Sequence, residues 1–361
     1  MSGIAGILNT ADSQHAFIAN VGQALVFDAV NTLLDQYNEE INASLAVFVE
    51  KTTEDFKVRY LLPGGGYLQE MGRQAPAAAA KAYGYYDVAF PLRMYGVEVA
   101  GDRVDLAYLT IAQMDVHLKN VMTQDLNTMR LRILTSLFED TNLTYIDEHH
   151  GTITICRLAN TDGTLYPPVL GTQVEADDHH YIYSGYDVAD IAAGANNPAV
   201  ALRDEISEYF GGVSTSGRQF VYFHGADQTA YLEAIAGFVP VSDRFIQEGA
   251  DTATTGGWPN VPGRIHGRGW GVWLSEWDGW IPDKFGIEVL MDVPAPLVMR
   301  VDPAATGLGQ GLQLVAKDVN HPMQRSSFEH RYGFGCGNRL SAACISICET
   351  GSYVPPTAYD E

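Results

Sequence analysis

Residues 105–138 read DLAYLTIAQMDVHLKNVMTQDLNTMRLRILTSLF, and this stretch has the clearest helical rhythm in the chain. Its apolar side chains recur every three or four residues, which places them on one face of a helix. They are Met114, Leu118, Val121, Met122, Leu126, Met129, Ile133, Leu134, Leu137 and Phe138. At about 1.5 Å per residue such a helix is on the order of 50 Å long. The pattern predicts a spine, either the core helix of a large enzyme or the beam of a thin, plate-shaped subunit.

The composition describes an ordered globular protein with a strong negative charge. The chain has 361 residues, of which 46% are hydrophobic, so it can bury a substantial core. With 44 acidic against 22 basic residues its net charge is −22. Because phosphate binding needs clustered Lys and Arg, direct wrapping of nucleic acid by a basic face is not expected, although an acidic shell could enclose it.

The sequence favours a chain that is made and folded in a cytoplasm. No Lys or Arg precedes Lys51, so the positive region of a secretory signal is missing. No apolar run approaches the roughly 18 to 20 residues that span a bilayer. The four cysteines, Cys156, Cys336, Cys344 and Cys348, are too few for a disulfide scaffold and form no CxxC pair. We expect buried, reduced thiols; an inter-subunit disulfide after release from the cell is the alternative.

The region before the spine divides into two parts of different character. Up to about Asp55, a helical pattern runs from Val26 to Phe48, as a self-standing helix or as an arm on a neighbour. From Lys57 to Asp102, glycines and prolines separate short β-favouring pieces. These pieces are Val58–Leu62, Tyr83–Phe90 and Met94–Val99. We expect a projecting two-stranded arm that needs another subunit to lie on, because an isolated hairpin is marginal in water.

The region after the spine predicts a strand and then a compact α/β unit. The strand is Thr152–Arg157, followed by a turn-rich piece. Asn197 and Pro198 suit the start of a helix, Phe220–Phe223 suits a buried strand, and Asp227–Ala236 suits a helix that Gly237 ends.

The remainder of the chain predicts further strands and a free end. We expect an exposed loop over Asp251–Gly271 and a mobile tail over Tyr353–Glu361. The expected strands are Trp270–Trp280, Gly286–Val293, Leu312–Ala316 and the long run Phe328–Cys348.

Two clusters have the composition of a metal site. They are Asp147-Glu148-His149-His150 and Asp177-Asp178-His179-His180. Carboxylates and imidazoles are usual ligands of hydrolytic metals. However, neighbouring side chains on a strand or turn point in different directions, and neither cluster has the spacing that aligns two His on a helix. We therefore expect solvated turns and assign no metal ligand.

Nucleophile and dinucleotide motifs are also missing. No Gly-x-Ser-x-Gly occurs, and Ser214–Gly217 lies in a Gly/Ser loop. The run Gly333–Asn338 has alternating glycines, but β-favouring residues follow it instead of a helix. Its glycines are better explained by a strand that packs closely against another backbone.

Five tryptophans lie within a short span and could form a stacking platform or a packed core. They are Trp258, Trp270, Trp273, Trp277 and Trp280. On a strand Trp273 and Trp277 would share one face, which suits a sheet packed on helices, an interface core, or sugar or base binding. The sequence thus assigns no catalytic, cofactor-binding or metal residues, and we expect a protein that is not an enzyme.

Several segments, in this order of elements, resemble a known family. They are LNTMRLRILTSLFEDTNLTY (126–145), GTITICRLANTDGTLYPPVLG (151–171), FVPVSDRF (238–245), VPAPLVMRVDP (293–303) and HRYGFGCGNRL (330–340). Together they resemble the major capsid proteins of tailed double-stranded DNA bacteriophages, whose fold is named after phage Hong Kong 97.

The resemblance implies an α+β fold with five parts. Residues 1–55 would be an N-terminal arm, 56–104 an extended β-hairpin loop, and 105–186 a peripheral domain with the spine helix at 105–138. Residues 187–319 would form an α/β axial domain, and 320–361 a C-terminal strand returning to the peripheral domain, with a tail.

The resemblance also implies a structural function. The chain would assemble with itself into hexamers and pentamers of an icosahedral head, made in the host cytoplasm and found in the virion. The head would enclose double-stranded DNA without sequence-specific binding. Portal, scaffolding and decoration proteins are further implied partners; a membrane and a cofactor are not. Some family members cross-link a loop Lys to an Asn of a neighbour; Lys81 lies in the expected loop, but no partner can be assigned.

Three alternatives remain open from the sequence. A bacterial nanocompartment shell of the same fold would enclose enzymes instead of a genome. A metal-dependent hydrolase would use Asp177, His179, His180 and Glu148. A tail or decoration protein would bind carbohydrate through the tryptophan-rich strand.

Overall fold

A computed structural model describes residues 4–8, 17–21, 23–61, 85–100, 108–160, 180–193, 195–208, 218–241, 261–291, 293–316, 325–349 and 351–359. Within these ranges the α-helices are α1 (Ile4–Ile7), α2 (Ile18–Val21), α3 (Gln23–Leu45), α5 (Ile111–Phe138), α6 (Pro198–Glu208) and α7 (Ala226–Ala234). The 3-10 helices are η1 (Val188–Ala193), η3 (Ala304–Thr306) and η4 (Arg339–Ser341). The strands up to β8 are β1 (Val49–Thr53), β2 (Lys57–Leu61), β3 (Tyr85–Ala89), β4 (Arg93–Ala100), β5 (Leu143–Asp147), β6 (Gly151–Ile155), β7 (Tyr181–Tyr183) and β8 (Phe220–His224). The later strands are β9 (Val239–Pro240), β10 (Arg264–Gly269), β11 (Val272–Glu276), β12 (Phe285–Leu290), β13 (Leu297–Arg300), β14 (Gln313–Ala316), β15 (Arg325–Cys336) and β16 (Ala342–Ser346).

The expected spine is helix α5, which is 28 residues long. It begins later than the sequence pattern suggested, because Thr110 caps it. The Thr110 side chain accepts a hydrogen bond from the backbone N–H of Gln113, and the Gln113 side chain accepts one from the backbone of Thr110. This reciprocal capping box fixes the first turn. Of the residues that the prediction added, Tyr108–Thr110 precede the helix and 105–107 lie outside the described residues.

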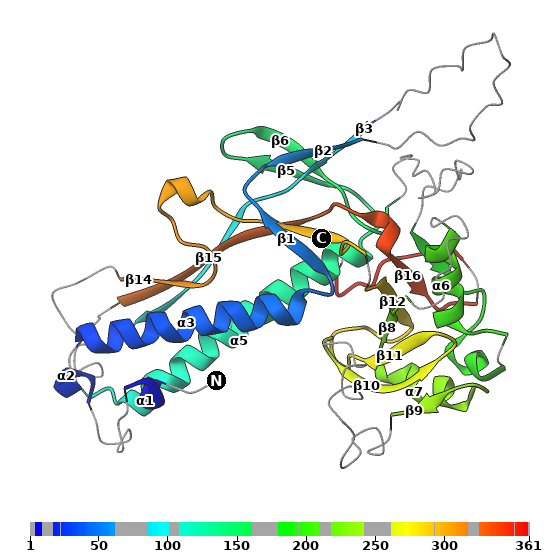
Figure 1. The fold of residues 1–361 in the computed structure, drawn as a ribbon, viewed down its shortest axis with the longest axis horizontal. Coiled ribbons are helices and arrows are strands. Elements are labelled where there is room, and N and C mark those ends of the chain that lie inside the picture. The colour runs from blue at the N-terminus through cyan, green and yellow to red at the C-terminus, as the bar shows by residue number, and fades with distance from the viewer. Residues whose placement is uncertain are drawn as a thin grey trace, which may run out of the picture.

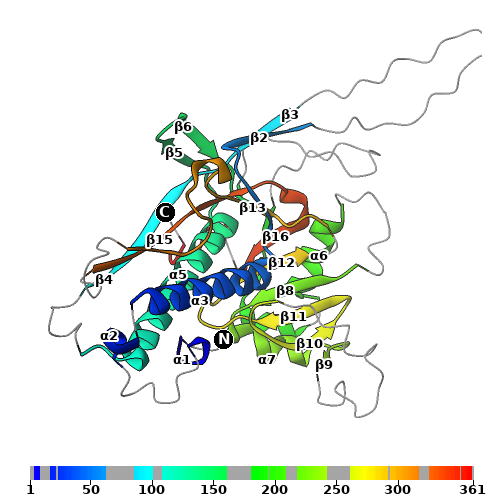
Figure 2. The same cartoon turned by 60° about the vertical axis from the view of Figure 1, so that its left-hand side comes forward.

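Helix α3 lies along the spine of its own chain (Figures 1 and 2). Its expected apolar face is buried against the spine, and the Tyr37 hydroxyl lies 2.8 Å from the carbonyl oxygen of Met122 and 3.0 Å from Oδ2 of Asp125. The helix is therefore not self-standing. Its buried side chains include Val26, Val30, Leu33, Leu34, Ile41 and Leu45.

A five-stranded sheet covers the two long helices. The 12-residue strand β15 is its centre, pairing with β4 and β14 along its first half and with β13 along its second. Strand β1 extends the sheet by pairing in parallel with β13. Neither β1 nor β13 was expected, because β1 (VEKTT) has only one apolar residue and β13 is a run of four residues that prolines flank.

Two antiparallel ribbons stand at one end of this sheet (Figure 1). The first pairs β2 with β3, which confirms two of the expected strands within a residue or two. The second pairs β5 with β6; of these only β6 was expected, as Thr152–Arg157. Both views show β2 and β3 pointing away from the rest of the described chain.

A mixed seven-stranded sheet forms the α/β unit, in the order β7-β16-β12-β8-β11-β10-β9. Side chains alternate along its strands: Phe220 and Tyr222 pack in one cluster with α6 and α7, while Val221 and Phe223 join the core that contains the spine. The expected helices and the expected strand β8 are confirmed. Because the sheet is buried on both faces, the α/β unit is fixed rigidly to the spine.

The expected exposed loop over Asp251–Gly271 is wrong at its C-terminal end. Residues 264–269 form β10, joined to β11 by Trp270 and Gly271, which both have positive φ (54° and 88°). Two such residues make a tight hairpin turn. The turn was missed because Trp at positive φ is unusual. Residues 251–260 lie outside the described residues.

The C-terminal region differs from its prediction in two ways. The long strand Phe328–Cys348 is two strands, since Asn338 caps the short helix η4 between β15 and β16, and β16 belongs to the α/β sheet. The tail expected to be mobile is docked: Tyr353 and Tyr359 are buried beside Phe138. The Tyr353 hydroxyl donates to the Phe138 carbonyl at 2.6 Å, and the Tyr359 hydroxyl donates to the carbonyl of Trp280. Two buried aromatic rings outweigh the low apolar content of the segment.

Candidate assembly interface

The outer end of the β2–β3 ribbon exposes apolar side chains. Leu61 and Tyr85 pair across the two strands and are 74% and 57% exposed. The Arg59 guanidinium lies 3.9 Å from the centre of the Tyr85 ring. The described end of the ribbon therefore presents two large apolar side chains to solvent.

Ion pairs hold the inner part of the same ribbon in register. Asp87 accepts from Arg59 at 2.7 Å and contacts Lys57 Nζ at 2.7 Å. The hydrogen bonds from Arg59 and Lys57 hold the pKa of Asp87 well below its ordinary value. The ribbon therefore stays charged and paired across the physiological pH range.

A buried ion pair anchors the base of both ribbons. Nη1 of Arg300, on β13, donates to the carbonyl oxygen of Phe90, at 2.9 Å, and to Oδ2 of Asp147, at 2.8 Å. The other Asp147 oxygen accepts the backbone N–H groups of His149 and His150. Burial acts to raise the pKa of Asp147, but these hydrogen bonds outweigh it and hold the pKa below its ordinary value. One guanidinium thus joins both ribbons to the sheet.

The glycine run Gly333–Asn338 packs against the ribbon base, as the sequence predicted. A Cβ atom at Gly335 would lie 2.8 Å from the Ala89 carbonyl oxygen, and one at Gly333 would overlap the carbonyl of Pro91. Only glycine lets these backbones approach so closely. The run is structural, and no helix follows it that could bind a dinucleotide.

A second buried polar cluster ties the spine to its neighbours. Asp125 of α5 contacts the Tyr37 hydroxyl of α3 with one oxygen and Nδ1 of His330, on β15, with the other. A cavity of about 150 Å³ lies beside it, between α5 and strands β4 and β15. Sequence reasoning missed this cluster and Arg300, since each has partners far away along the chain.

Of the two metal-like clusters, the structure describes all of the first and only His180 of the second. Asp147–His150 form the turn between β5 and β6, as expected, with Asp147 already bound to Arg300. Asp177 and His179 lie outside the described residues, and His180 is buried beside β16, where its carbonyl accepts from Cys344. In the described part of the chain no group of three or more His, Cys, Asp or Glu side chains could hold a metal ion. The other sequence candidates Ser214–Gly217, Lys81 and Trp258 also lie outside it.

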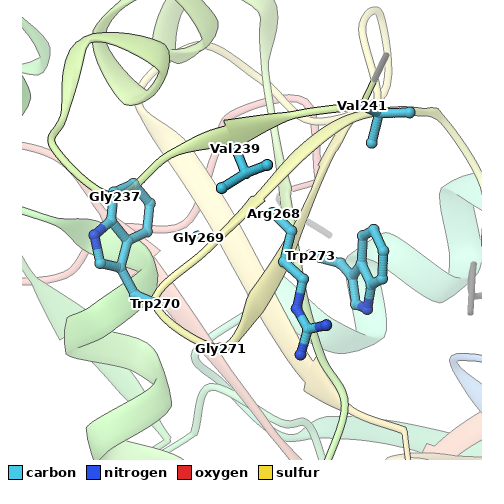
Figure 3. Close-up of a pocket in the computed structure, with 8 residues that line it drawn as sticks. All are labelled: Gly237, Val239, Val241, Arg268, Gly269, Trp270, Gly271 and Trp273. Atoms are coloured by element: carbon cyan, nitrogen blue, oxygen red, sulfur yellow. The ribbon is translucent and has the colours of Figure 1, made fainter. Parts of the chain in front are cut away.

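Of the four tryptophans in the described part of the chain, Trp273 and Trp277 are buried and Trp270 and Trp280 are half-buried. Trp277 is buried and stacks on Phe48 at 5.7 Å between ring centres, which joins the α/β unit to the end of α3. Trp270 and Trp273 line an open hollow of about 380 Å³ on the β9–β10–β11 edge (Figure 3). The Arg268 guanidinium lies 5.1 Å from the centre of the Trp273 ring. The described indoles therefore divide between the core and the wall of this hollow.

All four cysteines lie in the described part of the chain, and none of them forms a disulfide there. Cys336 and Cys344 are buried, as expected, and Cys156 and Cys348 are half-buried. Burial raises the pKa of the Cys344 thiol well above its ordinary value, so this thiol is unreactive.

No helix in the described ranges combines the length and the apolar character needed to cross a membrane. No family model matches the sequence, and no curated protein matches it.

Solved structures share the fold. A structure of Mycobacterium phage Patience covers 93% of this chain and 91% of its own, with a TM-score of 0.64 and 17% sequence identity. Weaker likenesses are the mature capsid of bacteriophage PhiM1 (83% and 84% covered, TM-score 0.48, 11% identity) and the capsid of cyanophage P-SCSP1u (84% and 87%, 0.45, 11%). The chain has the fold of the Mycobacterium phage Patience structure.

That shared fold agrees with the resemblance drawn from the sequence, and the mixture of helices and strands confirms the α+β class. The shared fold accounts for the spine and the sheet beside it, and for an α/β unit that shares their core. The division into arm, extended loop, peripheral domain and axial domain stays a prediction.

Proposed function

We propose that this protein is a structural shell subunit, the major capsid protein of a tailed phage, which assembles with itself into hexamers and pentamers of an icosahedral head. The fold shared with the Mycobacterium phage Patience structure supports the proposal. The observation that carries it is the β2–β3 ribbon, which leaves the body of the chain with an apolar outer end and an anchored base. In this proposal the ribbon is the extended loop that lies on an adjacent subunit.

The proposal includes a passive role toward the genome. The net charge of −22 favours an interior that encloses DNA without adhering to it, since adhesion to phosphate needs clustered cations. A non-enzymatic role follows from the same proposal, as do virion localisation and assembly in the host cytoplasm. Contacts with portal, scaffolding or decoration proteins belong to it as well.

Negative-stain microscopy of the expressed chain tests the proposal. Uniform closed shells are expected, and a preparation that contains only monomers or small oligomers contradicts it. Nucleic acid in particles purified from their source separates a genome container from a nanocompartment, which holds enzymes instead.

Two substitutions test the ribbon itself. Leu61→Glu and Tyr85→Ser place polar groups on the exposed end without touching the Arg300 anchor, so the monomer should fold and shells should be lost. Val354→Glu, at another exposed apolar position, is the matched control and should leave assembly intact. Intact shells from both ribbon variants would refute the ribbon contact while leaving the shell function standing.

A further inference from the structure

Three side chains of the α/β unit form a chain of close polar contacts. His224 ends strand β8, His266 lies in β10, and Glu233 lies in α7. Nδ1 of His224 lies 2.8 Å from the carbonyl oxygen of Gly225, and its Nε2 lies 2.9 Å from Nε2 of His266. Nδ1 of His266 lies 3.1 Å from Oε1 of Glu233. The chain therefore joins a helix to two strands of the sheet.

Counting protons shows that neutral rings cannot satisfy all three contacts. The Gly225 carbonyl only accepts, so Nδ1 of His224 must carry the proton of that ring. Its Nε2 is then an acceptor, and the proton between the rings must belong to Nε2 of His266. This leaves Nδ1 of a neutral His266 without a proton, facing a carboxylate oxygen that also only accepts. With both imidazoles neutral, the contact to Glu233 is not a hydrogen bond.

One added proton completes the chain, and a second disrupts it. A proton on Nδ1 of His266 makes an imidazolium that donates to Glu233 and to His224 at once. A further proton on Nε2 of His224 would point two N–H groups at each other across 2.9 Å and place two cations side by side. Only the singly charged chain has a hydrogen bond at every contact.

The groups around the two imidazoles determine which ring takes the first proton. Burial lowers the pKa of both imidazoles, that of His224 to about 4, although Glu233 and Glu276 favour a proton on His266. Arg264 opposes that proton, and the Tyr222 ring stacks on His224. His266 is less buried than His224 and alone touches a carboxylate, so it takes the first proton.

We propose that Glu233, His266 and His224 form a proton-operated clamp between helix α7 and strands β8 and β10, which one proton closes and a second opens. The clamp lies beside β9, because Gly267 pairs with Pro240. The protonation state of the clamp therefore affects how firmly the β9–β10 edge of the α/β unit is held. The proposal concerns the folded chain and does not depend on whether that chain builds a shell.

Magic-angle-spinning NMR of 15N-histidine-labelled protein reads the ring protons directly, in monomers or in particles. At pH 7.5 we expect the Nδ1–H tautomer for His224 and the Nε2–H tautomer for His266. On acidification His266 should become an imidazolium before His224 does. The Nδ1–H tautomer of His266 at neutral pH, or earlier protonation of His224, would overturn the proposal.

Glu233→Gln gives an independent test, because the amide N–H can donate to a neutral His266 and close the clamp without a proton. Because both imidazoles are buried, protonating them on acidification lowers the stability of the wild type as well. The melting temperatures of the variant and the wild type are therefore compared at each pH. At pH 7.5 the variant should melt about 2 °C above the wild type, and the advantage should vanish by about pH 5. Glu40→Gln, on the exposed face of α3, is the matched control and should change nothing. A Glu233→Gln protein that melts below the wild type at pH 7.5 indicates an ordinary ion pair and overturns the clamp.

Discussion

Nδ1 of His330 lies 2.8 Å from Oδ1 of Asp125, and this buried contact joins strand β15 to the middle of the spine helix. The other oxygen of Asp125 contacts the Tyr37 hydroxyl of α3, so one carboxylate links three elements. In the proposed shell, a subunit that tiles with copies of itself has to keep its own layers in fixed positions. The cluster achieves this at the place where a cavity interrupts the apolar packing.

Asp125→Ala should destabilise the chain strongly. The change removes the carboxylate partner of the buried His330 imidazole and one of the two contacts of the Tyr37 hydroxyl, which keeps the Met122 carbonyl. Breaking a buried pair costs about 3–5 kcal/mol. Chemical denaturation of the unassembled protein measures the loss. Asp35→Ala, at an exposed position on α3, is the control and should cost less than about 0.5 kcal/mol. A loss at Asp125 as small as the control would show that the cluster does not hold the layers together.

Alanine substitutions at three closely packed glycines should destabilise the chain to different degrees. Gly333→Ala forces a methyl group onto the Pro91 carbonyl, Gly335→Ala places one 2.8 Å from the Ala89 carbonyl oxygen, and Gly96→Ala leaves 3.1 Å to Phe328. Overpacking of this kind costs about 1–3 kcal/mol, so stability should fall most for Gly333 and least for Gly96. Thermal unfolding of the three variants gives the order, and a reversed order would contradict the close approach.

The sequence predicted correctly those elements whose formation depends on residues that lie close together in the chain. The spine was found because one apolar stripe continues over 28 residues, and the glycine run was read correctly because alternating glycines suit close backbone contact. Strands β1 and β13 were missed because each is only four or five residues long and gains its partner from the other end of the chain. The Asp125–His330 pair joins residues 205 positions apart, and no spacing rule could have found it.

The docked tail yields a third prediction. The Tyr353 ring is buried and its hydroxyl bonds to the last carbonyl of the spine helix. Tyr353→Phe should cost about 1 kcal/mol for the hydrogen bond, and Tyr353→Ala about 3–5 kcal/mol for the lost packing as well. Val354→Ala, at an exposed position next to it, should change little. Limited proteolysis detects release of the tail directly, because a released tail is cut while the body of the chain stays intact. Equal resistance of the wild type and Tyr353→Ala would mean that the tail is held by other contacts.

Glu288 gives a prediction about pH. It lies on β12 inside the seven-stranded sheet, fully buried, and neither carboxylate oxygen has a hydrogen-bond partner. Burial raises its pKa well above the ordinary value, a shift that Arg203 opposes and Asp204 adds to. Since the folded chain holds this proton more tightly than the unfolded chain, the stability that it contributes is complete below about pH 4 and is lost as the pH rises.

Glu288→Gln removes that dependence, because the amide stays neutral at every pH. The variant should match the wild type near pH 4 and exceed it by at least about 1 kcal/mol at pH 8, where the wild type must keep an acid protonated or bury a charge. Denaturant titrations at several pH values measure the difference, with Glu40→Gln as an exposed control that should show no trend. A difference that stays constant with pH would show that Glu288 titrates in the folded chain as it does in the unfolded one.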